Sequence, residues 1–199
     1  MINYNDVFMN KGLSYEAYRQ LIDEGLAEGR TTGADHSAMM VDYAKMNLHR
    51  MVRLDKTVML NEALLETLDG IQEDYRLLVI TEGWCGDAAQ LVPVFEKIAS
   101  AAPEKFELRL VLRDQNTDLI DQHLTNGGRA IPILLVLDSE GKLVKTWGPR
   151  PEVLKPLLAA WNKESEDMMV VAEKLHGWYA KDKTQSTQRE LSTLLSSLN

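Results

Sequence analysis

Residues 83–89, which read GWCGDAA, contain the side chain with the clearest chemical potential, Cys85. It follows a continuously apolar run and precedes a helical pattern, so we expect it at the first turn of a helix. The free backbone N–H groups and the positive dipole end at such a position favour an anion. They lower a cysteine pKa from ~8.5 to between roughly 3.5 and 7.5, although the nearby charge of Asp87 opposes a thiolate. We therefore predict a moderately lowered pKa and a nucleophilic role for Cys85.

Cys85 is the chain's only cysteine, which limits the reactions open to it. One thiol excludes an intramolecular disulfide and every metal site built from several cysteines. A lone thiolate can attack a disulfide, but a thiol from outside the chain must release the mixed disulfide that results. We expect no resident cofactor, with glutathione or an analogous thiol as co-substrate. The histidines show no metal-ligand spacing and are expected at the surface: His36, His49, His123 and His176.

The composition predicts one globular domain with a sizeable core. The chain has 199 residues, 45% of them hydrophobic. Its 30 acidic residues exceed its 22 basic residues, so neither a nucleic acid nor an anionic membrane is an expected partner. Residues 1–10 lack the basic start and apolar run of a secretory signal, and no apolar stretch is long enough to span a bilayer. We therefore expect a cytoplasmic protein, in a compartment where a lone thiol stays reduced.

Helical patterns occupy both ends of the chain. Residues 1–60 contain apolar residues at helical spacing, with Ser14 placed to cap a first helix and Asp35 a second. A short third helix is expected over residues 61–68. After residue 163, apolar stripes over residues 168–179 and 191–198 indicate two or three further helices.

The central part alternates strand and helix patterns. Strands are predicted over residues 77–81, 106–112, 133–137 and 143–147, the last two joined by a hairpin turn. One helix is predicted from about residue 85 to residue 100, with Pro93 inside it, and another from Thr117 to a glycine pair at residues 127–128. This order implies an α/β fold, in which helices pack on a mixed sheet.

Five segments, taken in their order and spacing, resemble the thioredoxin family. Trp84-Cys85-Gly86 matches the start of that family's Trp-Cys-Gly-Pro-Cys active site, and Pro93 falls where the family's active-site helix contains a proline. Residues 114–116 follow the next strand as a similar triplet does in thioredoxin. Residues 129–132 resemble the loop with the family's cis-proline, and Trp147-Gly148 ends the hairpin.

The resemblance covers residues 61–162 and implies a thioredoxin-like fold, a central mixed four-stranded sheet flanked by helices. Residues 1–60 and 163–199 would be helical N-terminal and C-terminal extensions packed on that domain. The chain is most similar to uncharacterised bacterial thioredoxin-like proteins with a Trp-Cys-Gly-Asp motif that lacks the second active-site cysteine.

The resemblance also assigns roles around the cysteine, where this chain departs from the family. Trp84 would form an apolar wall beside the sulfur, and Gly86 and Asp87 would border the bound substrate. Ala88 replaces the second cysteine and Asp87 the usual proline; Asp87 is either an early-turn helix acid or a proton-transfer group. The buried acid that assists proton transfer in many thioredoxins would fall at Val79, which cannot ionise.

The loop over residues 129–132 would complete the site. A cis bond between Ile131 and Pro132 would leave the Ile131 backbone free to pair with an extended peptide or a thiol-tripeptide lying across Cys85. Arg129 would attract a carboxylate of glutathione or of a similar low-molecular-weight thiol. Trp84, Gly86, Asp87, Arg129, Ile131 and Pro132 are thus the expected substrate-binding residues.

Two functions of different classes follow as alternatives. The first is a monothiol redox protein that acts through Cys85 on protein or low-molecular-weight disulfides, a thiol–disulfide oxidoreductase without a resolving cysteine. The second is a thioredoxin-fold module that binds or links proteins without catalysis, for which the missing second thiol and the missing acid argue. The expected partners are disulfide-containing or thiol-bearing proteins or small thiols.

Overall fold

The computed structural model describes residues 2–198 and contains one four-stranded sheet in the order β2-β1-β3-β4. Its strands are β1 (Tyr75–Thr81), β2 (Phe106–Leu112), β3 (Ile133–Leu137) and β4 (Leu143–Trp147). β1 pairs in parallel with β2 and antiparallel with β3, which pairs antiparallel with β4. The predicted α/β class and mixed four-stranded sheet are confirmed. β1 begins two residues earlier than predicted, because Tyr75 and Arg76 continue its pairing with β2.

The helix α5 (Gly86–Ala101) connects the two parallel strands and determines where Cys85 lies. It packs on β1 and β2, as a crossover between parallel neighbours must. The central strands β1 and β3 are buried almost throughout, which explains their continuous apolar sequences. Cys85 is the N-cap residue of α5, four residues after the carboxyl end of β1. The sequence prediction of a cysteine at a helix start is therefore confirmed.

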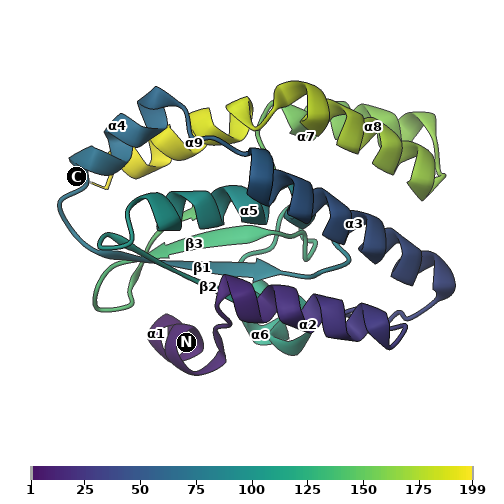
Figure 1. The fold of residues 1–199 in the computed structure, drawn as a ribbon, viewed down its shortest axis with the longest axis horizontal. Coiled ribbons are helices and arrows are strands. Elements are labelled where there is room, and N and C mark those ends of the chain that lie inside the picture. Colours follow the sequence, from purple (N-terminus) through teal and green to yellow (C-terminus); the bar gives the residue numbers. More distant parts are fainter. Residues whose placement is uncertain (1, 199) are drawn as a thin grey trace.

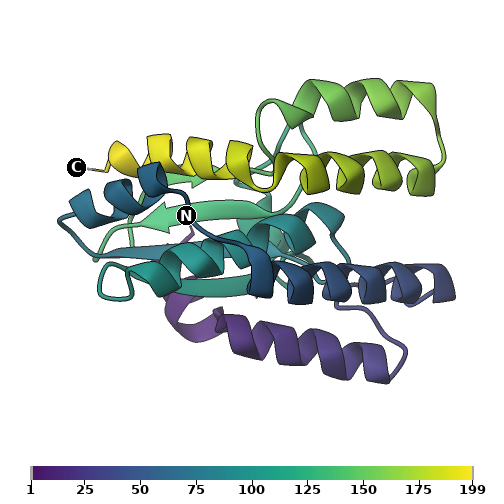
Figure 2. The same cartoon turned by 45° about the horizontal axis from the view of Figure 1, so that its top comes forward.

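The remaining helices pack around this unit (Figure 1). Before the sheet come α1 (Tyr4–Asp6), the π-helical turn η1 (Val7–Lys11), α2 (Tyr15–Ala27), α3 (Ala38–Thr57) and α4 (Glu62–Gly70). After it come α7 (Leu154–Glu164), α8 (Met168–Asp182) and α9 (Gln185–Ser196). α3 packs along α5, and α4 along α9, so segments from both ends of the chain lie side by side. Figure 2 shows α7 and α8 as a helical pair at one end of the molecule.

The structure confirms one of the two predicted helix caps, and it differs from the sequence predictions at the other cap and in the length of one helix. Ser14 caps α2 as predicted, since its Oγ accepts from the Ala17 N–H at 3.1 Å. Ser37 caps α3 instead of Asp35, because the Asp35 carboxylate accepts from the Ser37 N–H at 2.8 Å. Beyond the 3₁₀ turn η2 (Arg113–Gln115), α6 (Thr117–Ile120) is a single turn and ends well before the predicted glycine pair. The following residues form a tight turn closed by two backbone hydrogen bonds of 2.9 Å between Thr125 and Gly128.

Two contacts attach the N-terminal segment to the sheet. Leu13 exchanges two backbone hydrogen bonds of 2.8 Å with Leu110 and so covers part of the outer edge of β2. Glu82, directly after β1, is fully buried (0% exposed), and burial raises the pKa of its carboxyl group. Its carboxylate accepts from the Thr32 hydroxyl and from the Asp114 N–H at 3.0 Å.

Within residues 2–198, no helix has the length and apolar content that crossing a membrane requires.

Candidate functional site

The thiol of Cys85 lies between the start of α5 and the loop that precedes β3. Its Sγ donates to the backbone carbonyl of Ile131 at 3.4 Å. The backbone N–H groups of Asp87 and Ala88 also hydrogen-bond to the sulfur and lower the pKa of the thiol. This is the anion-favouring environment that the helix start predicts.

The predicted lowering of the Cys85 pKa is nevertheless wrong. Only 9% of the residue is exposed, and burial raises the pKa of the thiol to about 12. The negative charge of Asp87 raises it further, as expected, while the backbone amides and Arg150 offset only part of the increase. Burial disfavours the charged form of any acid. At neutral pH the thiol in this arrangement is therefore protonated.

The burial of Cys85 comes in part from α3 and α8, two helices that contact the residues next to it. On α3, the Asn47 side-chain amide donates to the Trp84 carbonyl at 2.9 Å, which fixes α3 over the residue before the cysteine. On α8, the Tyr179 hydroxyl donates to Asp87 at 2.6 Å, two residues after the cysteine. Helices from both ends of the chain thus cover the start of α5, a relation that local patterns do not reveal.

Asp87 is the acceptor of a buried ion pair. Arg150 donates to its carboxylate at 2.7 and 3.2 Å, and both side chains are largely shielded from solvent. Together with Tyr179, Arg150 satisfies the lone pairs of a carboxylate that is only 5% exposed. Arg150 is not among the site residues predicted from the sequence. Its signal is a cation between two prolines just after β4, a rigid position from which a long side chain reaches back to the site.

A second polar cluster connects α3, α5 and α8 beside the start of α5. The Gln90 side-chain amide donates to His176 Nδ1 at 3.0 Å, and His176 Nε2 lies 3.1 Å from the Tyr43 hydroxyl. His176 is only 8% exposed, so its predicted surface position is wrong. Burial, with the charges of Arg50 and Arg53 on α3, lowers the pKa of His176 to about 3. Its place in the apolar stripe of α8 is the signal that could have revealed its burial.

The loop over residues 129–132 contacts Cys85 through Ile131. Ile131 and Pro132 are buried, and the bond between them is cis. The Ile131 carbonyl already accepts from the thiol, so part of the backbone expected to be free for a ligand is in use. Arg129 is exposed and forms a two-pronged ion pair with Asp121 at 2.7 and 2.8 Å. A ligand carboxylate would have to compete with Asp121 for it.

Trp84 lies beside the cysteine on the other side of the site. The Arg113 guanidinium stacks over its ring, 4.7 Å from the ring centre. Its Nε1 also lies close to Gly33, where an added Cβ would lie only 2.4 Å away. The half-buried ring lines a cavity of about 270 Å³ together with Asp35 and Met40. Val79, at the position of the family's buried acid, is a core residue of β1.

Gly86→Ala is expected to destabilise the protein by about 1–3 kcal/mol, as overpacking of a tight site does. A Cβ at this position would lie 2.5 Å from the Tyr43 hydroxyl and 3.0 Å from the His176 ring. Urea denaturation gives the change in the free energy of unfolding. The matched control is Gly177→Ala in α8, where nothing lies within 4 Å of the added Cβ and where alanine should stabilise by roughly 0.5–1 kcal/mol. Equal effects of the two substitutions would contradict the contact.

The comparisons with known proteins agree with this architecture. A family model for thioredoxin matches residues 33–165, more than half of the chain, and includes α3, which the sequence resemblance left out. The fold is similar to that of a protein of unknown function from Pseudomonas aeruginosa, with a TM-score of 0.66, 21% identity and 100% coverage of both chains. It is also similar to an HIV epitope scaffold, with a TM-score of 0.55, 20% identity, and coverage of 94% of this chain and 99% of the scaffold. No curated protein matches the sequence. With its family match and its mixed sheet, the chain belongs to the thioredoxin family.

Proposed function

We propose that this protein exchanges disulfides through the single thiol of Cys85 and that an external thiol completes the reaction. The observation that carries the proposal is the position of Sγ, between the first backbone amides of α5 and the Ile131 carbonyl. The amides are placed to stabilise a sulfur anion, and the loop before β3 offers main-chain groups to a bound disulfide. A partner that displaces α8, which packs against α5, would reduce burial, the largest cause of the raised pKa.

The reaction has two balanced steps. In the first, the Cys85 thiolate attacks one sulfur of a disulfide, a bond forms to that sulfur, and the second sulfur leaves as a thiolate that takes up a proton. In the second step an external thiolate attacks the partner's sulfur in the mixed disulfide. Cys85 leaves as a thiolate and is reprotonated, while the external thiol becomes the new disulfide partner. The substrate disulfide is the oxidant, and the external thiol supplies the electrons.

The burial of Cys85 favours a second candidate, a non-catalytic binding module. A thiol with a pKa of about 12 and 9% exposure is a poor nucleophile at neutral pH. Neither a second cysteine nor an ionisable residue at position 79 is present to assist it. In this alternative the fold is retained for the surfaces that it presents, and Cys85 is a core residue.

Exposure of the folded protein to oxidised glutathione distinguishes the two candidates. For disulfide exchange we expect one adduct by intact mass, absent from Cys85→Ser and removed by excess dithiol. Its rate should rise about tenfold per pH unit between roughly pH 7 and 9, because the thiolate fraction grows in that proportion below the thiol pKa. The control is the same chain in urea, where the thiol is accessible. An adduct that forms in urea but not on the folded protein would overturn disulfide exchange and leave the binding module.

A further inference from the structure

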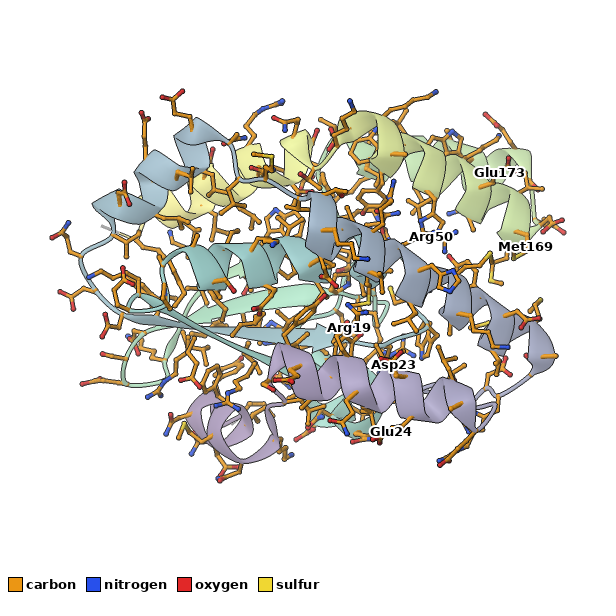
Figure 3. The ribbon with its side chains drawn as sticks, viewed as in Figure 1. Arg19, Asp23, Glu24, Arg50, Met169 and Glu173 are labelled. Carbon is orange, nitrogen blue, oxygen red and sulfur yellow. The ribbon has the colours of Figure 1, made fainter. Side chains whose placement is uncertain are left out.

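A pocket of about 380 Å³ lies between α3, the start of α5 and α8, and neither the thiol chemistry nor the family match assigns it a role. Its volume falls within the roughly 300–1,000 Å³ of ordinary small-ligand sites. One wall is apolar and belongs to α8, where Val171, Ala172 and Leu175 contribute. Tyr43 lines the pocket from α3 and Gly86 from the start of α5, while Asn162 and Ser165 line it from the end of α7 and the residue after it. Figure 3 labels Arg50 on α3 and Met169 on α8, the two helices that border this space.

Tyr43 supplies this pocket with an uncommitted hydrogen-bond donor. The His176 ring is neutral, and its Nδ1 accepts from the Gln90 amide, so its only proton is on Nε2. That proton is donated to the Tyr43 oxygen at 3.1 Å. The hydrogen of the Tyr43 hydroxyl is then free, because His176 is the only hydrogen-bond partner of this hydroxyl among residues 2–198. Tyr43 is only 8% exposed, and a buried donor without an acceptor costs about 1–3 kcal/mol.

The charges around the pocket determine what can satisfy that donor. Asp87 and Glu166 line it, and none of its lining residues is Lys or Arg. Asp87 is neutralised by Arg150, whereas Glu166 is exposed at the rim. A free anion would meet the Glu166 carboxylate without a balancing cation. An uncharged carbonyl can accept from Tyr43 at no such cost, and a neighbouring N–H can donate to Glu166.

We propose that this pocket binds a short extended segment of a partner protein, through one backbone amide unit and one aliphatic side chain. The backbone carbonyl accepts from the Tyr43 hydroxyl, and a backbone N–H faces Glu166. The aliphatic side chain packs on Val171, Ala172 and Leu175. This binding goes beyond disulfide exchange and does not require a reactive Cys85. A negative result for disulfide exchange would therefore leave this proposal unaffected, and the reverse also holds.

Titration with capped leucine (N-acetyl-leucine N-methylamide), followed by ¹H–¹⁵N NMR of the reduced protein, tests the proposal. We expect saturable shifts at Gly86, Glu166 and Leu175, with an affinity weakened roughly three- to tenfold in Tyr43→Phe through loss of one hydrogen bond. The matched control is Tyr75→Phe, whose hydroxyl donates to the Leu198 carbonyl instead of facing the pocket. Capped aspartate should bind more weakly than capped leucine, because its charge faces Glu166.

A pocket-filling variant and a longer peptide complete the test. Ala172→Leu fills the pocket from the α8 side and should abolish the shifts while the spectrum stays dispersed. A capped tripeptide with a central leucine should bind more tightly than capped leucine if the ligand is a chain segment; equal affinity would restrict the site to small amides and contradict the proposal. Absence of shifts at the pocket, or an affinity unchanged by Tyr43→Phe, would overturn it.

Discussion

Arg150→Met is expected to lower the free energy of unfolding by about 3–5 kcal/mol at neutral pH. The substitution retains most of the side-chain volume but removes the only cation that contacts Asp87 among residues 2–198. An ionised carboxylate with 5% exposure would then keep the Tyr179 hydroxyl as its one side-chain donor. Thermal and urea denaturation of the purified protein measure the loss.

Two comparison variants separate charge burial from packing. In the double variant Arg150→Met with Asp87→Asn the unpaired charge is gone, so most of the stability should return. Arg129→Met removes a similar two-pronged pair, with Asp121, at an exposed position, where ion pairs contribute roughly 0–1 kcal/mol. A loss below about 1 kcal/mol in Arg150→Met, or a double variant as unstable as the single one, would contradict the proposed role of the pair.

Acidification is expected to cost about 2.5 kcal/mol of stability between roughly pH 7 and 4.5 through His176 alone. The folded-state pKa of His176 is lowered to about 3, whereas an unfolded chain takes up this proton near pH 6.5. As the pH falls, His176 therefore takes up a proton in the unfolded state before it does so in the folded state. The contribution of His176 is complete above the unfolded pKa and is lost as the pH falls toward the folded one.

The measurement is the free energy of unfolding at a series of pH values. Carboxylates also titrate in this range, so the informative quantity is the difference in slope between the native protein and His176→Gln, which has no ring to protonate. His49→Gln, at an exposed position of α3, removes a histidine without touching the buried cluster. Parallel curves for the native protein and His176→Gln would contradict a neutral buried imidazole.

The sheet could be predicted from the sequence because each strand has a local signature. β2, β3 and β4 begin and end where the apolar patterns do, and Cys85 lies at the start of α5 as the strand-to-helix transition indicates. Short helices are harder to predict. Leu119, Ile120 and Leu124 have helical spacing, yet the chain turns after Ile120 and leaves Leu124 exposed.

The environment of the thiol could not be predicted, because it depends on residues distant in the chain. Asn47 and Tyr179 lie on helices at opposite ends of the sequence, and both bond to neighbours of Cys85. A helix start by itself predicts a stabilised thiolate. The packing of α3 and α8 over that start reverses the prediction, since desolvation outweighs the amides. His176 was misplaced for the same reason, as its partners come from α3 and α5.

The contacts of the Glu82 carboxylate have a consequence for how the protein unfolds. The carboxylate joins the end of β1, the loop between α2 and α3, and the segment after β2 through two hydrogen bonds. Detachment of the N-terminal helices while the sheet remained formed would break the Thr32 bond to this acid, the two Leu13 bonds to β2 and the Asn47 bond to the Trp84 carbonyl at once. The N-terminal helices and the sheet should therefore unfold together as one cooperative unit, and the helices should not detach first from a sheet that stays folded.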